Sequence, residues 1–112
     1  MALIGTFVPT PNGFTGRIQT LLLDAEVTLS EIREPIGDNP PDYLITLGKH
    51  GEGSFIGTGR KRKMEKGGAF ISIRIDDPAL SQPMFAGLFP AEKSNALFNL
   101  YWTRVNRQGD RP

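Results

Sequence analysis

The chain is divided into short apolar segments that glycine and proline interrupt at intervals of roughly ten residues. The 13 Gly and 9 Pro are spread through all 112 residues. Helical periodicity is nearly absent from the apolar pattern. Gly and Pro at this frequency would also interrupt long helices. We therefore predict an all-β fold, in which a single-domain antiparallel meander closes into a small barrel or sandwich.

The clearest strand is Ala69 to Ile75, where apolar and polar residues alternate with a period of two. We expect its isoleucines to point into the core and Phe70, Ser72 and Arg74 to lie on the other face. Trp102 alternates in step with its apolar neighbours and is expected to anchor the core. Further strands are predicted over residues 3–8, 14–23, 26–33, 43–47, 54–59, 84–89 and 96–104, with Asp24 and Ala25 as a tight connection.

One core suits a chain of this length, so we predict a single β domain over residues 1–104 and a flexible tail over residues 105–112. Without cysteine the chain has no disulfide, thiolate metal site or thiol nucleophile. The first residues lack the basic and apolar regions of a signal peptide, and no apolar run is long enough to span a membrane. We expect a soluble, cytoplasmic protein.

Charge is segregated along the chain although the net charge is only +1. Residues 24–42 contain six acidic residues and one basic residue, whereas residues 60–74 contain six basic residues and one acidic residue. The molecule would be bipolar if these two segments lay on different faces.

We predict that residues 60–68 form a basic turn before the strand at Ala69, and this turn is the main candidate binding site. Its cations could contact phosphate, and an aromatic ring beside them could stack on a base, as in proteins that bind single strands. A solvated hairpin tip and a site for an acidic protein remain open alternatives. The candidate nucleic-acid-binding residues are Arg60, Lys61, Arg62, Lys63, Lys66, Arg74 and Phe70.

Other candidate features favour structural roles. An outward row of Phe70, Phe85, Phe89 and Tyr101 could bind a ligand, but we favour packing in a second core layer. Asp76-Asp77-Pro78 is typical of a turn.

Catalytic and cofactor chemistry is poorly supported. His50 has no companion residues for a triad or a zinc site, and the glycine clusters match no phosphate-binding loop. We therefore expect no catalytic residue, no metal and no cofactor.

Several motifs resemble a family of small proteobacterial proteins known as domain of unknown function 736 (DUF736). They span nearly the whole chain, in matching order: Ile4-Gly5-Thr6-Phe7, Asn12-Gly13-Phe14-Thr15-Gly16, Asp42, Ser72 through Asp76-Asp77-Pro78, and Leu100-Tyr101-Trp102-Thr103-Arg104. The resemblance implies a small β-rich domain in a bacterial setting, often on plasmids and other mobile elements, and it implies no activity. Where such sequences tend to carry Trp-Lys-Lys, this chain has Arg60-Lys61-Arg62 and lacks the indole.

These observations predict a non-enzymatic binding module. The leading hypothesis is binding of single-stranded DNA or RNA through the basic turn. The alternative is a protein-interaction module that uses its acidic segment or a sheet edge. Such a module could be an inhibitor or accessory factor of a host or mobile-element complex, including one directed against a defence system. The sequence leaves the oligomeric state open.

Overall fold

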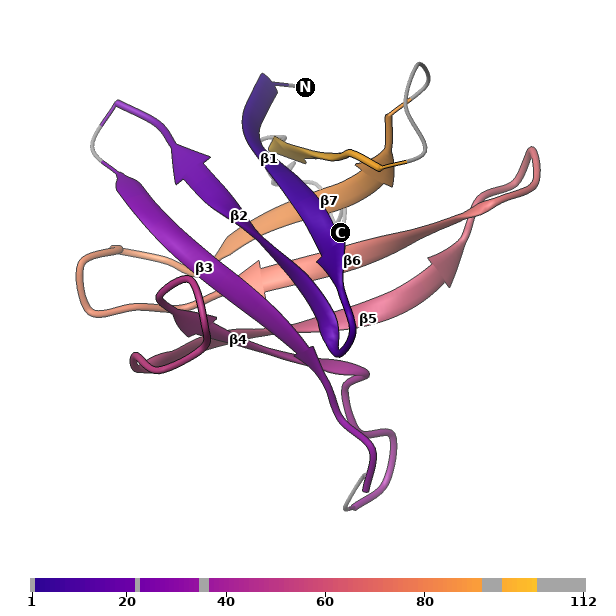
Figure 1. Cartoon of the computed structure of the whole chain (residues 1–112), viewed down its shortest axis with the longest axis horizontal. Helices are drawn as coiled ribbons and strands as arrows, with labels where there is room; N and C mark the ends of the chain where they lie inside the picture. Colours follow the sequence, from indigo (N-terminus) through magenta and orange to yellow (C-terminus); the bar gives the residue numbers. More distant parts are fainter. Residues whose placement is uncertain (1, 22, 35–36, 92–95, 103–112) are drawn as a thin grey trace.

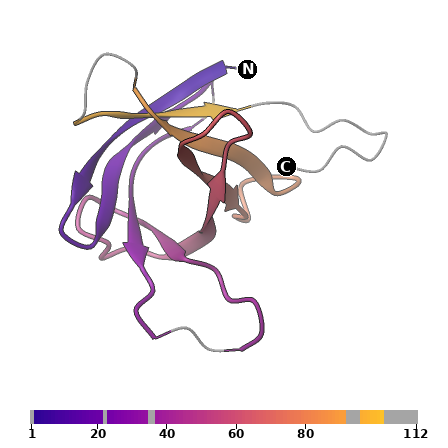
Figure 2. The same ribbon diagram turned by 90° about the vertical axis from the view of Figure 1, so that its right-hand side faces the viewer.

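The computed structural model describes residues 2–21, 23–34, 37–91 and 96–102 as one closed barrel of eight antiparallel strands in sequence order (Figures 1 and 2). Each strand pairs with its neighbours in the chain, and β8 closes the barrel against β1. The prediction of an all-β meander forming a small barrel is confirmed. The strands are β1 (Ala2–Thr10), β2 (Gly13–Gln19), β3 (Asp24–Glu31), β4 (Tyr43–Leu47), β5 (Phe55–Lys63), β6 (Ala69–Ile75), β7 (Met84–Pro90) and β8 (Phe98–Trp102).

The core fills the inside of the barrel with alternate side chains from every strand, as the pleat of a strand requires. Ile71, Ile73 and Ile75 are all buried, which confirms the expected inward face of β6. Trp102 is partly buried and packs against the core, also as expected. The largest fully buried side chains are Phe7, Leu29, Ile45, Ile73, Leu88, Leu100 and Val27.

The predicted strand over residues 14–23 was too long. β2 ends at Gln19, and Thr20 and Leu23 close a tight turn, because Thr20 N donates to Leu23 O (2.8 Å) and Leu23 N donates to Thr20 Oγ1 (3.1 Å). Asp24 and Ala25, predicted as a connection, are the first residues of β3. The Thr20 hydroxyl stabilises this turn, which contains neither glycine nor asparagine. Because Leu21 and Leu23 are apolar, the sequence suggested that the strand continues.

The first four residues of the predicted basic turn, 60–63, belong to a strand. β5 continues to Lys63, and only Met64 to Gly68 turn, with Met64 N donating to Gly68 O over 3.0 Å. Gly67 and Gly68 have φ angles of 95° and 87°, which the turn needs and other residues rarely adopt. Pairing with β6 holds residues 60–63 in a strand. Their charged side chains are compatible with this strand because they can remain in water and need not enter the core.

The barrel has two distinct ends. The β1–β2, β3–β4, β5–β6 and β7–β8 connections meet at one end, and the other three connections meet at the opposite end, from which β1 starts and at which β8 finishes. The predicted tail over residues 105–112 lies outside the described residues. The described part of the chain contains no helix that could cross a membrane.

Candidate nucleic-acid interface

The ends of β5 and β6 leave the barrel as a two-stranded ribbon. β5 pairs with β4 only as far as Gly59, and β6 pairs with β7 only from Ile71 onward. Arg60 and Lys61 still lie opposite Ser72 and Ile71, which also pair with β7. Beyond them β5 and β6 pair only with each other, in the pairs Arg62–Phe70 and Lys63–Ala69. We call residues 60–70 the basic ribbon, and Figure 1 shows it projecting to the right of the barrel.

The cations of the basic ribbon are divided between its two sides. Alternation along β5 places Arg62 opposite Phe70 on the outer side of the sheet. Lys61 and Lys63 lie on the side that continues the barrel interior, and Lys66 lies in the turn. The basic residues therefore do not form one continuous patch, although they are adjacent in the sequence.

Three aromatic side chains lie on the outside of the barrel next to the ribbon. Phe70 of β6 stacks on Phe89 of β7, with ring centroids 4.8 Å apart and planes 12° apart. Phe89 meets the edge of Tyr101 of β8 at 6.0 Å. The Phe89 ring also covers Gly87, where a β-carbon would lie 2.6 Å from Cε1. We call Phe70, Phe89 and Tyr101 the aromatic strip.

The aromatic strip corrects the expectation of a second core layer. A closed barrel has a single sheet, and none of the four outward aromatics named from the sequence belongs to the buried core. Phe70, Phe85, Phe89 and Tyr101 are half-buried. Phe70, Phe89 and Tyr101 bury part of their area against one another, and all four aromatics leave part of their area open to solvent.

The β3–β4 loop holds the base of the ribbon through two of the candidate residues. Arg60 donates from Nη2 to Asn39 O (3.0 Å) and from Nη1 to both Asn39 Oδ1 and Pro40 O (3.2 Å each). Lys61 Nζ pairs with Glu31 Oε2 at 3.0 Å, and Lys61 N donates to Asp42 Oδ2 at 2.8 Å. The hydrogen bond with Glu31 raises the pKa of the Lys61 ammonium, so this side chain stays charged and engaged.

Lys61 also covers the aromatic residues that close this end of the barrel. Its Nζ lies 5.8 Å from the centre of the Tyr43 ring, within the range of a cation–π contact. Phe14 packs against Tyr43 at 6.0 Å and against Phe98 at 4.7 Å. Burial raises the pKa of the Tyr43 hydroxyl, which is neutral at neutral pH. Lys61 therefore has a structural role in addition to its charge.

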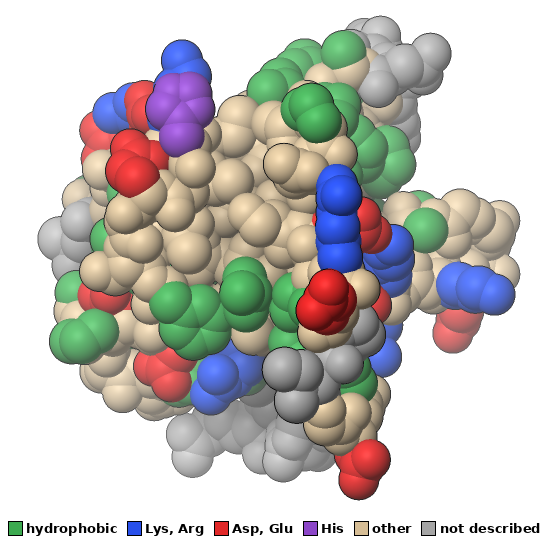
Figure 3. All heavy atoms as spheres, turned by 60° about the horizontal axis from the view of Figure 1, so that its bottom comes forward, with side chains coloured by type: hydrophobic (Ala, Val, Ile, Leu, Met, Phe, Trp, Pro, Cys, Tyr) green, Lys and Arg blue, Asp and Glu red, His purple; other side chains and the backbone are tan. Residues whose placement is uncertain are grey.

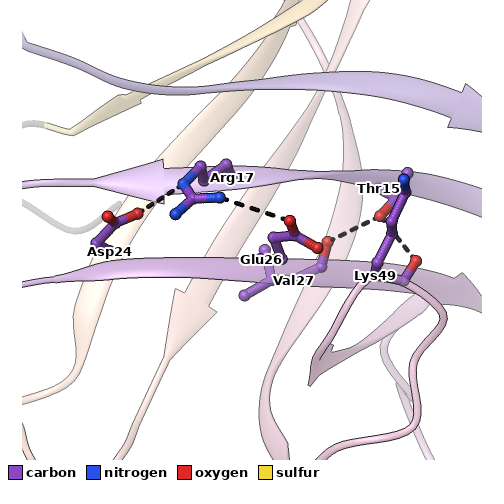
Figure 4. Close-up of polar contacts among 6 residues, drawn as sticks. All are labelled: Thr15, Arg17, Asp24, Glu26, Val27 and Lys49. Atoms are coloured by element: carbon purple, nitrogen blue, oxygen red, sulfur yellow. Dashed lines mark hydrogen bonds and ion pairs between the residues drawn. The ribbon is translucent and has the colours of Figure 1, made fainter.

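The acidic and basic segments meet, so the molecule is not bipolar in the way their separation in sequence suggested. Glu31 contacts the ribbon through Lys61, as described above. Asp24 and Glu26 pair with Arg17 of β2, at 2.6 and 3.5 Å, on the outside of the barrel (Figure 4). The hydrogen bond from Arg17 lowers the pKa of Asp24. On the face shown in Figure 3, acidic and basic side chains are interspersed.

The remaining candidate cations differ in whether they form an ion pair within the molecule. Arg74 lies on the outer face of β6 and approaches Asp76 at 3.5 Å, a loose and exposed pair. Among the residues that the structure describes, Arg62, Lys63 and Lys66 have no ion pair. These three cations and the aromatic strip are the groups on this side of the barrel that remain available to a ligand.

The residues considered for catalysis have local partners. Asp77 Oδ2 accepts a hydrogen bond from Ala79 N (2.9 Å), and Leu80 N donates to Asp77 O (2.8 Å), which confirms the turn predicted at Asp76-Asp77-Pro78. The backbone N–H of His50 donates to Glu52 Oε1 (2.9 Å). Within the described ranges no three side chains of His, Cys, Asp or Glu are placed to hold a metal ion.

Sequence reasoning named Arg62, Lys63 and Lys66 as candidates and singled out the aromatic row, but it did not predict the contacts of Arg60 and Lys61. The one available signal was the β3–β4 loop itself, which is acidic and ends immediately before the strand that pairs with β5. Asp42 stood out in the sequence only through a family resemblance, and its carboxylate receives the backbone N–H of Lys61 where the ribbon leaves the barrel.

These features define a small closed β-barrel that extends a basic ribbon beside an external aromatic strip. The chain belongs to the family described as "Protein of unknown function (DUF736)", whose model matches residues 3–105. No curated protein and no solved structure matches the chain.

Proposed function

We propose that this protein is a non-enzymatic module that binds single-stranded nucleic acid through the basic ribbon and the aromatic strip. One observation carries the proposal: Arg62 and Phe70 are a cross-strand pair on the outer face, and Phe70 stacks on Phe89. Single-strand binders combine cations that follow the phosphates with exposed rings on which bases stack.

The cations support this proposal through their lack of partners. Arg62, Lys63 and Lys66 have no ion pair in the described part of the chain, so phosphate would not need to displace a carboxylate. Arg74 adds a further cation on the outer face, and its pair with Asp76 is long enough for a phosphate to compete with it. Arg60 and Lys61 are not assigned to the ligand, because they hold the β3–β4 loop and the base of the ribbon.

The aromatic strip favours single strands over duplexes. A ring can stack only on a base whose face is free, and bases in a duplex are already stacked on their neighbours. The strip runs over three adjacent strands of a rigid barrel, so its rings are held in place before a ligand arrives.

Fluorescence anisotropy with short labelled DNA and RNA strands tests the proposal. We expect the unmodified protein to bind single strands more tightly than the matching duplex. Replacing Arg62, Lys63 and Lys66 together by glutamine should abolish binding, whereas Lys49→Gln, at the opposite end of the barrel, should leave it unchanged. If the triple variant binds as well as the Lys49→Gln control, the basic ribbon is not the site.

The protein-interaction alternative has less support from the geometry. Every strand of the barrel is paired on both sides, so the unpaired backbone edges lie in the short, charged ribbon. Four carboxylates of the acidic segment are engaged within the molecule, by Arg17 and by Lys61. A stoichiometric protein partner that remains bound after nuclease treatment would favour this alternative over nucleic acid.

A further inference from the structure

We propose that the end of the barrel opposite the basic ribbon is a binding site for a small apolar molecule with one cationic group, such as a short branched or monocyclic amine. The site would be independent of nucleic-acid binding, because it shares no residue with the ribbon or the aromatic strip. Its two parts are an apolar cleft in the mouth of the barrel and a carboxylate at the edge of that cleft.

The cleft has an accessible volume of about 100 Å³. Its floor consists of Ile18, Val27, Ile56 and Ile75, which are buried core residues from four different strands. Half-buried side chains form the rim, among them Leu23 from the β2–β3 turn, Leu80 from the β6–β7 loop and Met84 at the start of β7. The lining therefore comes from strands β2 to β7 and from two of the loops between them.

The volume limits the ligand to a small one. An apolar cavity of about 150 Å³ accepts benzene and excludes water, so a space of this size suits a body of about five carbon atoms. It is too small for a typical drug-sized ligand, which needs a pocket of at least about 300 Å³. Filling the cleft would remove apolar surface from water and restore dispersion contacts that the lining side chains lack.

Asp77 determines the charge of the ligand. It is the one charged residue among those that line the cleft. Its Oδ2 caps the turn by accepting from Ala79 N, whereas in the described part of the chain its Oδ1 has no hydrogen-bond partner and neither oxygen has an ion pair. The neighbouring Asp76 lies outside the cleft, close to Arg74. An ammonium group beside Asp77 would gain a charge-assisted hydrogen bond while the apolar body fills the cleft.

Methyl NMR titration with 3-methylbutylamine, and with 3-methylbutanol as its uncharged match, tests the proposal. We expect the amine to shift the methyl signals of Ile18, Val27 and Leu80, and to bind more tightly than the alcohol. Asp77→Asn should weaken amine binding by about fivefold, the usual scale for one partly exposed charge contact, and leave the alcohol unaffected. Asparagine can still cap the turn, so the fold should be retained.

Two further variants complete the test. Asp76→Asn removes a neighbouring charge that does not line the cleft and should behave as the unmodified protein. Ala25→Leu should fill the cleft and prevent binding of both compounds. The proposal is overturned if amine and alcohol bind equally, if neither moves the methyl signals, or if the signals depend on protein concentration alone. In the last case a second copy would occupy the cleft, and Leu21, which is 99 % exposed on the adjacent turn, would be the residue to test.

Discussion

The affinity for a single strand should fall with salt by an amount set by the number of free cations. Each phosphate contact to a single strand contributes a slope of about −0.7 to the dependence of log K on log salt concentration. Contacts from the three unpaired cations Arg62, Lys63 and Lys66 therefore predict a slope of about −2, which is roughly a 20-fold loss between about 50 and 200 mM salt, and a further contact from Arg74 would bring the slope to about −3. If all six bases of residues 60–74 contacted phosphate, the slope would be about −4 and the loss roughly 300-fold.

One substitution should increase the number of cations available to phosphate and so steepen the salt dependence. Glu31→Gln releases Lys61 from its ion pair, so one more cation becomes available and the slope should steepen by about 0.7. Lys49→Gln, on the β4–β5 loop at the other end of the barrel, should leave the slope unchanged. Anisotropy titrations at four or more salt concentrations measure all three slopes. A slope near zero for the unmodified protein would refute phosphate binding, and an unchanged slope in Glu31→Gln would refute the role given to that carboxylate.

Three further outcomes follow from individual contacts. Phe70→Leu should weaken single-strand binding by about 1 to 3 kcal/mol without changing the salt slope, because it removes stacking and no charge. A loss of affinity that is accompanied by a shallower salt slope would contradict this. Gly57→Ala should lower the free energy of unfolding by roughly 1 to 3 kcal/mol in denaturant titrations, because a β-carbon there would lie 2.2 Å from the carbonyl oxygen of Arg74; unchanged stability would show that the strands can move apart. Arg17 lowers the pKa of Asp24, so the stability from this pair is present above the usual aspartate pKa and is lost as the pH falls through the lowered value. Unfolding midpoints measured near neutral pH and in acid should therefore differ less in Asp24→Asn than in the unmodified protein.

The period of two in the sequence was sufficient to predict the class of fold and the inward face of β6. Ile71, Ile73 and Ile75 are buried because only one face of a barrel strand meets the core, and the alternation records that choice directly. The limits of the strands were harder to predict. Leu21 and Leu23 continue an apolar run through a turn, and Arg60 to Lys63 continue a strand through a basic run. The hydrogen bonds between Thr20 and Leu23 close the first turn, and pairing with β6 keeps residues 60–63 in a strand, so in both places hydrogen bonding overrides the local composition.

The candidate site could be predicted only in part, because counts of charge along a chain ignore the direction of side chains. Arg62 and Lys63 are neighbours in sequence but lie on opposite sides of the ribbon, so they would meet a ligand from different directions. Glu31 is 30 residues from Lys61 and forms an ion pair with it only because β4 places β3 and β5 on either side of itself. No local pattern in the sequence encodes that contact.

The same geometry assigns loop anchoring and base stacking to different residues. Arg60 is the first residue of the basic ribbon, and its guanidinium holds the β3–β4 loop through Asn39 and Pro40. A base would find its stacking surface on the next strand, where Phe70 faces outward beside Arg62. If the proposed function is correct, loop anchoring and base stacking are separate tasks here. Arg60→Gln should then loosen the β3–β4 loop and leave the stacking contribution of Phe70 intact. Phe70→Leu should remove the stacking contribution and leave the loop in place.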